Sequence, residues 1–151
     1  MFNHARNLLW LMLVALLLGS AQAQNYPTKP IRLVIGFPPG GAADILGRIA
    51  AQRLTDALGQ QVVVDNRSGA GGSIAAEIAA RSVPDGYTLY FTSLPHVINP
   101  HLYEKVNYDA IKDFAPVAQF VGDTPEQYTA FFKTEIEKWG KAVRVSGAKV
   151  D

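Results

Sequence analysis

The sequence predicts an α/β fold, a layered domain around a parallel sheet, from three observations. Three short runs are rich in apolar, β-branched or aromatic residues and are therefore typical of strands. The segments that follow the first two runs carry apolar residues at helical spacing. Glycine-dense turns separate strand from helix. Strands that alternate with helices favour parallel pairing with right-handed crossovers.

The three strands are expected at Ile31 to Ile35, Gln61 to Asp65 and Tyr87 to Thr92. The first ends at Gly36, directly before the sequence PPGG, and is expected to be buried. Pro84-Asp85-Gly86 predicts a turn before the third strand. After Thr92 the pattern is less regular, and Ser93 to Asp113 is expected to be a loop with one helical turn near Asp109. Phe114 to Phe120 is expected to form a strand, either at an edge of the sheet or as a crossover, because Pro116 cannot donate to a sheet ladder.

Three helices are expected. The first runs from Ala42 to Leu58 and stops at Gly59; its inward face is predicted to hold Leu46, Ala50, Leu54 and Leu58, flanked by Ile45 and Ile49. The second follows the loop from Asn66 to Gly72 and runs through Ser82, with Ile74 and Ile78 facing inward. The third begins with Thr124 as N-cap, Pro125 at the first helical position and Gln127 completing a capping box, and runs to about Ser146. Its apolar side holds Tyr128, Phe131, Phe132, Ile136, Trp139 and Val143, with an expected ion pair between Glu137 and Lys141.

The first 23 residues have the pattern of a secretory signal peptide. Arg6 precedes an apolar run from Leu8 to Leu18, and small residues stand at Ala21 and Ala23. A membrane anchor is the alternative, but the run is about half of the ~20 residues that a bilayer span needs. We therefore expect cleavage after Ala23 and export to the periplasm. The remaining 128 residues suffice for one domain and contain 13 basic and 13 acidic residues, so no nucleic-acid partner is expected.

Two glycine loops are the candidate ligand site. Each stands where a parallel strand ends and a helix begins, so both are expected at one edge of the sheet. Glycine permits close backbone approach, and the first N–H groups of a helix favour an anion. For either loop alone, a tight turn is the alternative. The predicted ligand-binding residues are Pro39, Gly40, Gly41, Ala42, Asp44, Ser68, Gly69, Ala70, Gly71, Gly72, Thr92 and Ser93.

Neither loop matches a phosphate-binding pattern, so the expected guest is a small carboxylate. Asp44 is expected either to cap its helix or to contact the ligand. Arg67 either neutralises a second carboxylate or points to solvent. His96 and His101 lack a third ligand partner, so no metal is expected, and no cofactor is expected either. No nucleophile with its base is evident, so the chain is not expected to be an enzyme; an exported enzyme with an oxyanion site at the loops is the remote alternative.

Several motifs in order resemble one family. IRLVIGFPPGGAAD (31–44), VVVDNRSGAGG (62–72), PDGYTLYFT (84–92), NPHLY (99–103) and DFAPV (113–117) are similar to the tripartite tricarboxylate transporter receptors, the Bug family of periplasmic solute-binding proteins. The resemblance covers Tyr26 to about Phe120. It implies a type II periplasmic-binding-protein-like lobe with a parallel or mixed sheet flanked by helices.

The part from Val121 to Asp151 resembles the extreme C-terminus of that family, which is about twice this length. The expected organisation is therefore a signal peptide (1–23), a first α/β lobe (24–120) and a C-terminal helical segment (121–151), with a junction near Phe120-Val121 and most of the second lobe missing.

The resemblance implies a receptor that clamps a carboxylate between its glycine loops and delivers it to integral-membrane transporter subunits. A missing lobe predicts weakened affinity. The alternative is a non-functional product of an internal deletion. The missing lobe also predicts an unpaired sheet edge and self-association.

Overall fold

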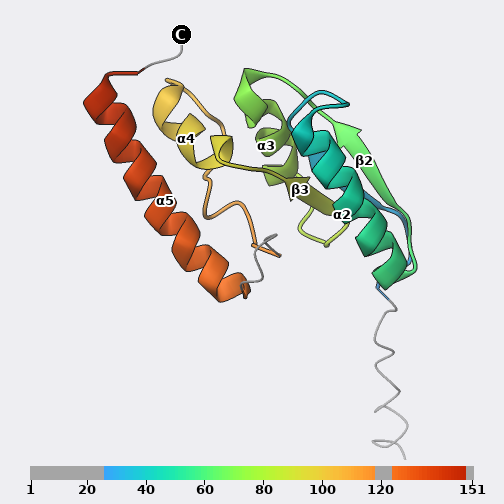
Figure 1. The fold of residues 1–151 in the computed structure, drawn as a ribbon. Coiled ribbons are helices and arrows are strands. Elements are labelled where there is room, and N and C mark those ends of the chain that lie inside the picture. The colour runs from blue at the N-terminus through green and yellow to red at the C-terminus, as the bar shows by residue number, and fades with distance from the viewer. Residues whose placement is uncertain (1–25, 118–123, 149–151) are drawn as a thin grey trace, which may run out of the picture.

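The computed structural model describes residues 26–117 and 124–148, and these form a parallel sheet with helices on both faces (Figure 1). The predicted cleavage site after Ala23 and the predicted junction near Phe120-Val121 lie outside the described residues. Three strands form the sheet: β1 (Ile31–Ile35), β2 (Val62–Asn66) and β3 (Thr88–Phe91). Their order is β2-β1-β3, and β1 pairs in parallel with both neighbours. The predicted parallel α/β fold is therefore confirmed.

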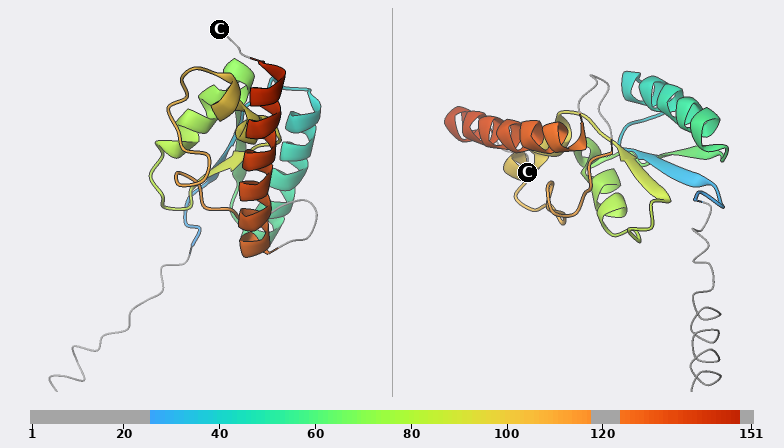
Figure 2. Two further views of the ribbon diagram at one scale, coloured as in Figure 1. Left: turned by 90° about the vertical axis from the view of Figure 1, so that its left-hand side faces the viewer. Right: turned by 90° about the horizontal axis from the view of Figure 1, so that it is seen from below.

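The sheet divides the structure into layers, which Figure 2 shows from two further directions. Helix α2 (Ala42–Leu58) covers one face, with a core of Ile31, Leu33 and Ile35 against Ala51. Helix α3 (Ser73–Ala80) covers the other face, and α4 (Pro95–Leu102) and α5 (Pro125–Ser146) lie beyond it. A second core of Ala76, Tyr108 and Ala110 joins these outer elements, with Ile136 of α5 packed against it.

Helix α2 has the predicted bounds and ends at Gly59 in the left-handed conformation, but most of its predicted inward face is wrong. Ile45, Leu46, Ile49 and Leu58 are exposed, and the buried positions are Asp44, Gly47 and Ala51. Gly47 explains the rotation, because a Cβ there would lie 2.4 Å from Ile35 Cδ1. The helix therefore approaches the sheet along its small residues, with Leu54 also packed on the core.

The second helix is shorter than predicted, and Ile74 is exposed rather than inward. The buried residues of α3 are Ser73, Ala75 and Ala76. A Cβ built on Gly36 would lie 3.4 Å from Ala75 Cβ, so small residues again face the sheet. In both helices, close contact with the sheet selects alanine and glycine over the larger side chains that define the apolar stripe in sequence.

Helix α4 corrects the prediction of a loop from Ser93 to Asp113. Its two prolines in eight residues argue against a helix from sequence, yet Pro95 stands in the first turn, where a missing N–H costs little. Packing of His96, Val97 and Asn99 into the interior stabilises this short helix. The predicted turn near Asp109 is confirmed, because Asp109 Oδ1 accepts hydrogen bonds from the backbone N–H groups of Ile111 and Lys112.

The segment from Phe114 to Val117 is not a strand, and the rest of that predicted strand lies outside the described residues. Helix α5 has the predicted bounds, with the capping box between Thr124 and Gln127 present. Its ion pair joins Lys138 to Glu135 instead of the predicted Glu137 and Lys141. Phe131 is exposed, whereas Phe132 lies against the His96 ring with centroids 5.3 Å apart. Within the described ranges, no helix combines the length and apolar character needed to cross a bilayer.

Candidate functional site

The two glycine loops leave the sheet side by side, as predicted. In the parallel register Ile35 is opposite Asn66, so β1 and β2 end together. Arg67 N donates to Ile35 O at 2.8 Å, and Asn66 Nδ2 donates to Phe37 O at 2.9 Å. A Cβ on Gly36 would lie only 2.8 Å from Gly72 Cα, so the start of the first loop touches the end of the second. Gly36 thus needs to be glycine for the loops to touch, whereas Gly72 is favoured as glycine by its φ of +96°.

The first loop runs from Phe37 to Gly41 and leads into α2. Gly40 has φ +85°, and Gly41 is the N-cap residue, whose carbonyl accepts from Ile45 N at 3.0 Å. No side chain caps this helix start. Pro39, Gly40, Gly41 and Ala42 are all exposed. The first-turn N–H groups therefore face a surface that an outside acceptor can reach.

Asp44 is 3% exposed and braces the first loop from inside. Its Oδ2 accepts from Gly40 N and from Arg48 Nε, both at 2.9 Å, and its Oδ1 accepts from Asn66 Nδ2 at 3.0 Å. The hydrogen bonds from Arg48, Gly40 and Asn66, in that order, lower the pKa of this carboxyl group to about 2. Both oxygens are thus occupied within the protein, and the helix cap is Gly41 rather than Asp44.

The second loop is built from successive left-handed residues. Gly69, Ala70, Gly71 and Gly72 have φ values of +132°, +46°, +59° and +96°. Gly72 N donates to Gly69 O at 2.9 Å, within the short 3-10 helix η1 (Ala70–Gly72). Helix α3 follows with Gly72 as N-cap and without a side-chain cap. Ser68, Gly69, Ala70 and Gly71 are exposed, whereas Gly72 and Ser73 at the helix start are buried, so the outward-facing part of this site is the loop itself.

Thr92 and Ser93 follow the third strand at the same edge, because Phe91 pairs with Ile35. Ser93 is exposed, and its backbone carbonyl accepts from His96 N at 3.0 Å. Thr92 Oγ1 donates to Ser93 O at 3.4 Å. The structure therefore brings all three predicted site segments to one edge of the sheet, in the order second loop, first loop, Thr92-Ser93.

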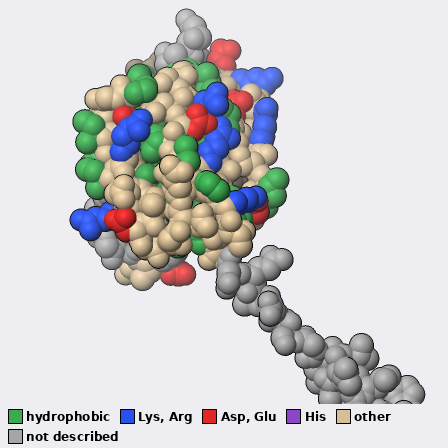
Figure 3. Space-filling model, turned by 90° about the vertical axis from the view of Figure 1, so that its right-hand side faces the viewer, with side chains coloured by type: hydrophobic (Ala, Val, Ile, Leu, Met, Phe, Trp, Pro, Cys, Tyr) green, Lys and Arg blue, Asp and Glu red, His purple; other side chains and the backbone are tan. Residues whose placement is uncertain are grey.

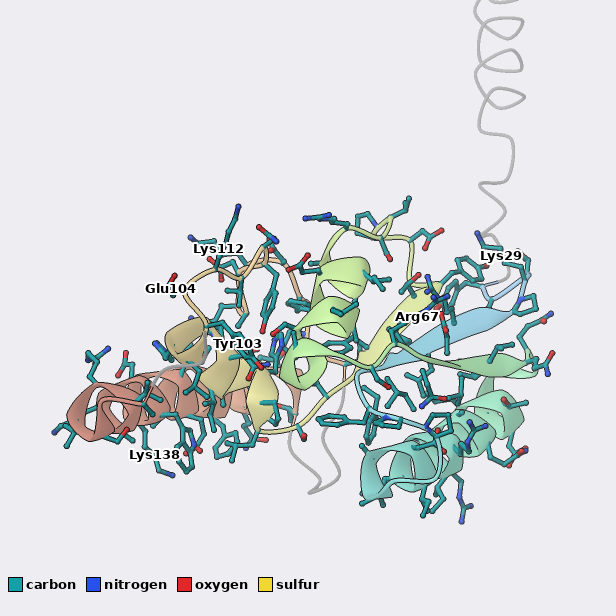
Figure 4. The ribbon with its side chains drawn as sticks, turned by 90° about the horizontal axis from the view of Figure 1, so that it is seen from above. Lys29, Arg67, Tyr103, Glu104, Lys112 and Lys138 are labelled. Carbon is teal, nitrogen blue, oxygen red and sulfur yellow. The ribbon has the colours of Figure 1, made fainter. Side chains whose placement is uncertain are left out.

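Arg67 does not reach over the glycine loops. Its Nε lies 2.9 Å from Asp65 Oδ1, and the side chain is 51% exposed. Figure 4 labels Arg67 beside the sheet. Arg32 shares the same carboxylate, with Nε 2.7 Å from Asp65 Oδ2. These three side chains line a hollow of about 410 Å³ together with Pro30, Ile31, Val63 and Val64. None of the predicted ligand-binding residues lines that hollow.

Two residues near the loops were missed by the sequence reasoning. Arg48 pairs with Asp44 and also donates through Nη2 to Asn66 Oδ1 at 3.3 Å. Its position four residues after Asp44 was the available signal. Asn99 of α4 donates to the second loop, and no spacing in the sequence points to that contact.

His96 and His101 serve as packing residues. His96 is 3% exposed, stacks on Tyr108 with ring centroids 5.4 Å apart, and has Nε2 3.2 Å from Ala110 O. Burial lowers the pKa of His96 to about 4, against a smaller opposing effect of that backbone contact. A Cβ on Gly140 of α5 would lie 2.7 Å from the His101 ring. Among the described residues, no cluster of three or more His, Cys, Asp or Glu side chains is arranged to hold a metal ion.

The comparisons with known proteins give the family. A family model described as "Tripartite tricarboxylate transporter family receptor" matches residues 46–141. The chain belongs to this receptor family. The match begins within α2, so the second loop lies inside the matched span and the first loop precedes it.

Three similar proteins illustrate the extent of the likeness. Protein BugT of Bordetella pertussis is 44% identical over 105 residues, which are 68% of this chain and 32% of BugT. A solved "periplasmic transporter" is 47% identical, with a TM-score of 0.61 over 63% of this chain and 32% of its own. R. palustris Rpa4515, solved with adipate, is 42% identical, with a TM-score of 0.59 over 61% of this chain and 31% of its own. The chain spans about a third of the length of the receptor-family relatives that it matches, which corresponds to one lobe.

Proposed function

We propose that this chain is the carboxylate-binding lobe of a periplasmic solute receptor. The observation that carries the proposal is the contact between two glycine loops at the starts of α2 and α3, where neither helix has a side-chain cap. Two uncapped helix starts at one sheet edge present backbone N–H groups to the same region. A similar receptor-family protein solved with adipate supports a carboxylate as the guest.

The roles of the site residues follow from their positions. Gly41 and Ala42 offer amides at exposed positions of the first loop, and Gly69, Ala70 and Gly71 those of the second. The amides of Gly40 and Gly72 already donate to Asp44 Oδ2 and to Gly69 O, so these two glycines shape the loops. Ser68, Thr92 and Ser93 offer hydroxyl groups beside them. Pro39 shapes the first loop. Asp44 acts as a positioning residue, because both of its oxygens already accept hydrogen bonds from the protein.

Affinity should be weaker than that of a two-lobed receptor. The loop residues are exposed, whereas a ligand pocket normally buries 70–90% of its guest. One lobe supplies one wall. Isothermal titration of the protein without residues 1–23, with adipate, succinate, citrate, glutamate and an aromatic acid, should give dissociation constants of about 0.1 mM or weaker. Submicromolar binding by a monomer would refute the one-wall account, and no binding at any concentration would refute the proposed function.

A matched pair of glycine variants separates binding from stability. Gly40 in the first loop and Gly59 at the end of α2 both have positive φ, and a Cβ at either meets no atom within 4 Å. Alanine should therefore cost each about 1 kcal/mol of folding stability. Only Gly40→Ala should also weaken carboxylate binding. Equal affinities for both variants would show that the first loop is not part of the site.

The wider function also belongs to this proposal. The predicted periplasmic location, the membrane subunits that receive the cargo, and the division into a lobe at 24–120 and a C-terminal segment at 121–151 rest on family membership and on the short span of the matches. The deletion product is the alternative function, and sequencing across the codons for Phe120 and Val121 tests whether the junction is genuine. If sequencing confirms the junction in the gene and the protein binds no carboxylate, the deletion product is favoured.

Self-association is the remaining proposed interaction. Within the described residues, β2 pairs only with β1, and Val63 on β2 is exposed. An unpaired edge strand can pair with another chain. Figure 3 shows a face on which basic side chains lie among acidic and hydrophobic ones rather than in a single stripe. Light scattering at high protein concentration should detect association, and a clean monomer would argue against it.

A further inference from the structure

Asn99 of α4 holds the second glycine loop from behind. Asn99 is 5% exposed, and its Nδ2 lies 3.0 Å from Gly71 O and 2.9 Å from Ser73 Oγ. Ala70 O is also within reach, at 3.5 Å. These partners are separated from Asn99 by 26 to 29 residues in sequence. One buried amide therefore links α4 to the loop and to the first residue of α3.

The chemistry of the partners fixes the orientation of this amide. A backbone carbonyl oxygen only accepts hydrogen bonds, so the nitrogen of Asn99, and not its oxygen, must face Gly71. The amide has two hydrogens, and the two shorter contacts use them. Ala70 O receives a second donor, the backbone N–H of Ser73. The inner side of the loop is thus satisfied by specific donors.

The loop conformation needs such support. Ala70 has φ +46°, which costs an L-residue about 1 kcal/mol, and three left-handed glycines surround it. A strained backbone of this kind persists only where the surroundings fix it. Two tyrosines add to the support. Tyr90 Oη donates to Gly72 O at 3.4 Å, and a Cβ on Gly71 would lie 3.2 Å from Tyr103 Oη. Figure 4 places Tyr103 between α4 and α3.

The position of the carbonyl groups determines the position of the amides. In a trans peptide the C=O and N–H bonds point in opposite directions. Fixing Ala70 O and Gly71 O toward α4 therefore directs the N–H groups of Gly71 and Gly72 away from α4. Gly72 N is bonded to Gly69 O, which leaves the Gly71 amide as the donor on the outer, exposed side.

We propose that Asn99 is a positioning residue that fixes the peptide planes of the second glycine loop and thereby sets carboxylate affinity. The ligand part of this inference rests on the proposed function, whereas the loop part does not. Asn99 contacts the loop and not the guest, so its loss should act through loop order.

The test uses Asn99→Ala, which removes the donors, and Asn99→Asp, which keeps the shape but replaces the donors with acceptors. Asn107→Ala is the matched control, because Asn107 Nδ2 also makes a buttressing bond, to Glu77 Oε1 at 3.0 Å, but not to the loop. Two readouts are taken at a temperature at which each variant is fully folded: amide hydrogen exchange at 69–72 without ligand, and adipate affinity by titration.

Both Asn99 variants should exchange faster at 69–72 and bind adipate about tenfold more weakly, and Asn107→Ala should match the parent protein in both readouts. Exchange at the parent rate would overturn the inference, as would faster exchange with unchanged affinity. If the parent itself binds no carboxylate but the Asn99 variants still exchange faster, the proposed function fails and the loop role stands. If neither variant folds, NMR contacts between the Asn99 side-chain amide protons and Gly71 in the parent protein decide, and their absence would overturn the inference.

Discussion

The two glycine loops meet at one edge of the sheet but are held in different ways. The first loop is braced by a charged group close in sequence, since Asp44 bonds to Gly40 N and to Arg48 within four residues on either side. The second loop is braced by a neutral amide, Asn99, which reaches Gly71 from a separate helix. The first brace is part of the loop's own helix, and the second depends on the packing of α4.

This difference predicts that the loops will respond differently to perturbation. The first loop should withstand any change that leaves α2 and β2 intact, because its side-chain bonds come from Asp44 of α2 and Asn66 of β2. The second loop depends on α4, and α4 in turn packs against α5 through the contacts of His96 with Phe132 and of His101 with Gly140. Conditions that loosen the α4–α5 layer should therefore release the second loop first.

The largest expected effect breaks the contact that the loops share. Gly36→Ala places a Cβ 2.8 Å from Gly72 Cα, backbone against backbone, and should lower the free energy of unfolding by about 3 kcal/mol. Gly41→Ala is the control: its φ is −78° and the nearest atom to the new Cβ is 3.6 Å away, so a change within about 0.5 kcal/mol is expected. Urea unfolding measures both, and an unperturbed Gly36→Ala would show that the loops do not touch.

Mild acid should loosen the second glycine loop, which Asn99 of α4 supports, before the first loop, which Asp44 supports. The pKa of His96 is lowered from 6.5 to about 4 in the folded protein, so the unfolded chain binds the proton more readily between these values. Stability should therefore fall as the pH drops, by about 2 kcal/mol from pH 7 to pH 5. His96→Leu should remove this dependence. Amide protection factors at pH 5 should fall in α4 and at 69–72 before they fall at 37–41. An unchanged pH profile in His96→Leu would contradict the buried neutral imidazole.

Asp44→Asn should have a smaller effect and act on the first loop. Asparagine keeps an oxygen acceptor for Gly40 N but loses the charge that pairs with Arg48. The pKa of Asp44 is lowered to about 2, so the stability it contributes is present above about pH 4 and is lost as the pH falls toward 2. Asp44→Asn should lack that loss when unfolding is followed from pH 5 to pH 2.

Asp109→Asn provides the comparison for this measurement. The pKa of Asp109 is also lowered to about 2, chiefly by the backbone N–H groups of Lys112 and Ile111, but its turn lies away from the loops. Asp109→Asn should lack the loss of stability that Asp109 causes in the same pH range. It should leave amide hydrogen exchange at 37–41 unchanged. Faster exchange there in Asp109→Asn would contradict the local character of the first brace.

The smallest expected effect is at the N-terminus of α5. Thr124→Ala removes the cap of a capping box and should cost about 1 kcal/mol in urea unfolding. Thr134→Ala, the same substitution on the exposed middle of that helix, should be neutral or slightly stabilising. Carboxylate affinity should be unchanged in both. Weaker binding in Thr124→Ala would show that even fraying of α5 reaches the second loop.

Several elements could be predicted from the sequence because their signals are local. Ile31 to Ile35 is a continuous apolar run, Ala42 to Leu58 is bounded by glycines, and Thr124 to Gln127 forms a cap within four residues. The placement of the two loops at one edge followed from parallel pairing, which the alternation of elements predicts. That a carboxylate binds there stays a prediction.

Other features were decided by tertiary contacts. The inward face of α2 was mispredicted because Gly47 and Ala51 pack against the sheet, and periodicity assigns larger side chains to that role. Helix α4 was missed because its two prolines outweigh a local helix signal, and only the burial of His96, Val97 and Asn99 compensates for them.

The sequence by itself determined the three strands, helices α2 and α5, the glycine loops and the receptor-like motifs, since these depend on contacts between residues near in the chain. The tertiary structure alone decided which faces are buried and that Asn99 supports the second loop. Such contacts join residues about 28 positions apart, and their energies arise from packing geometry that neither composition nor spacing encodes.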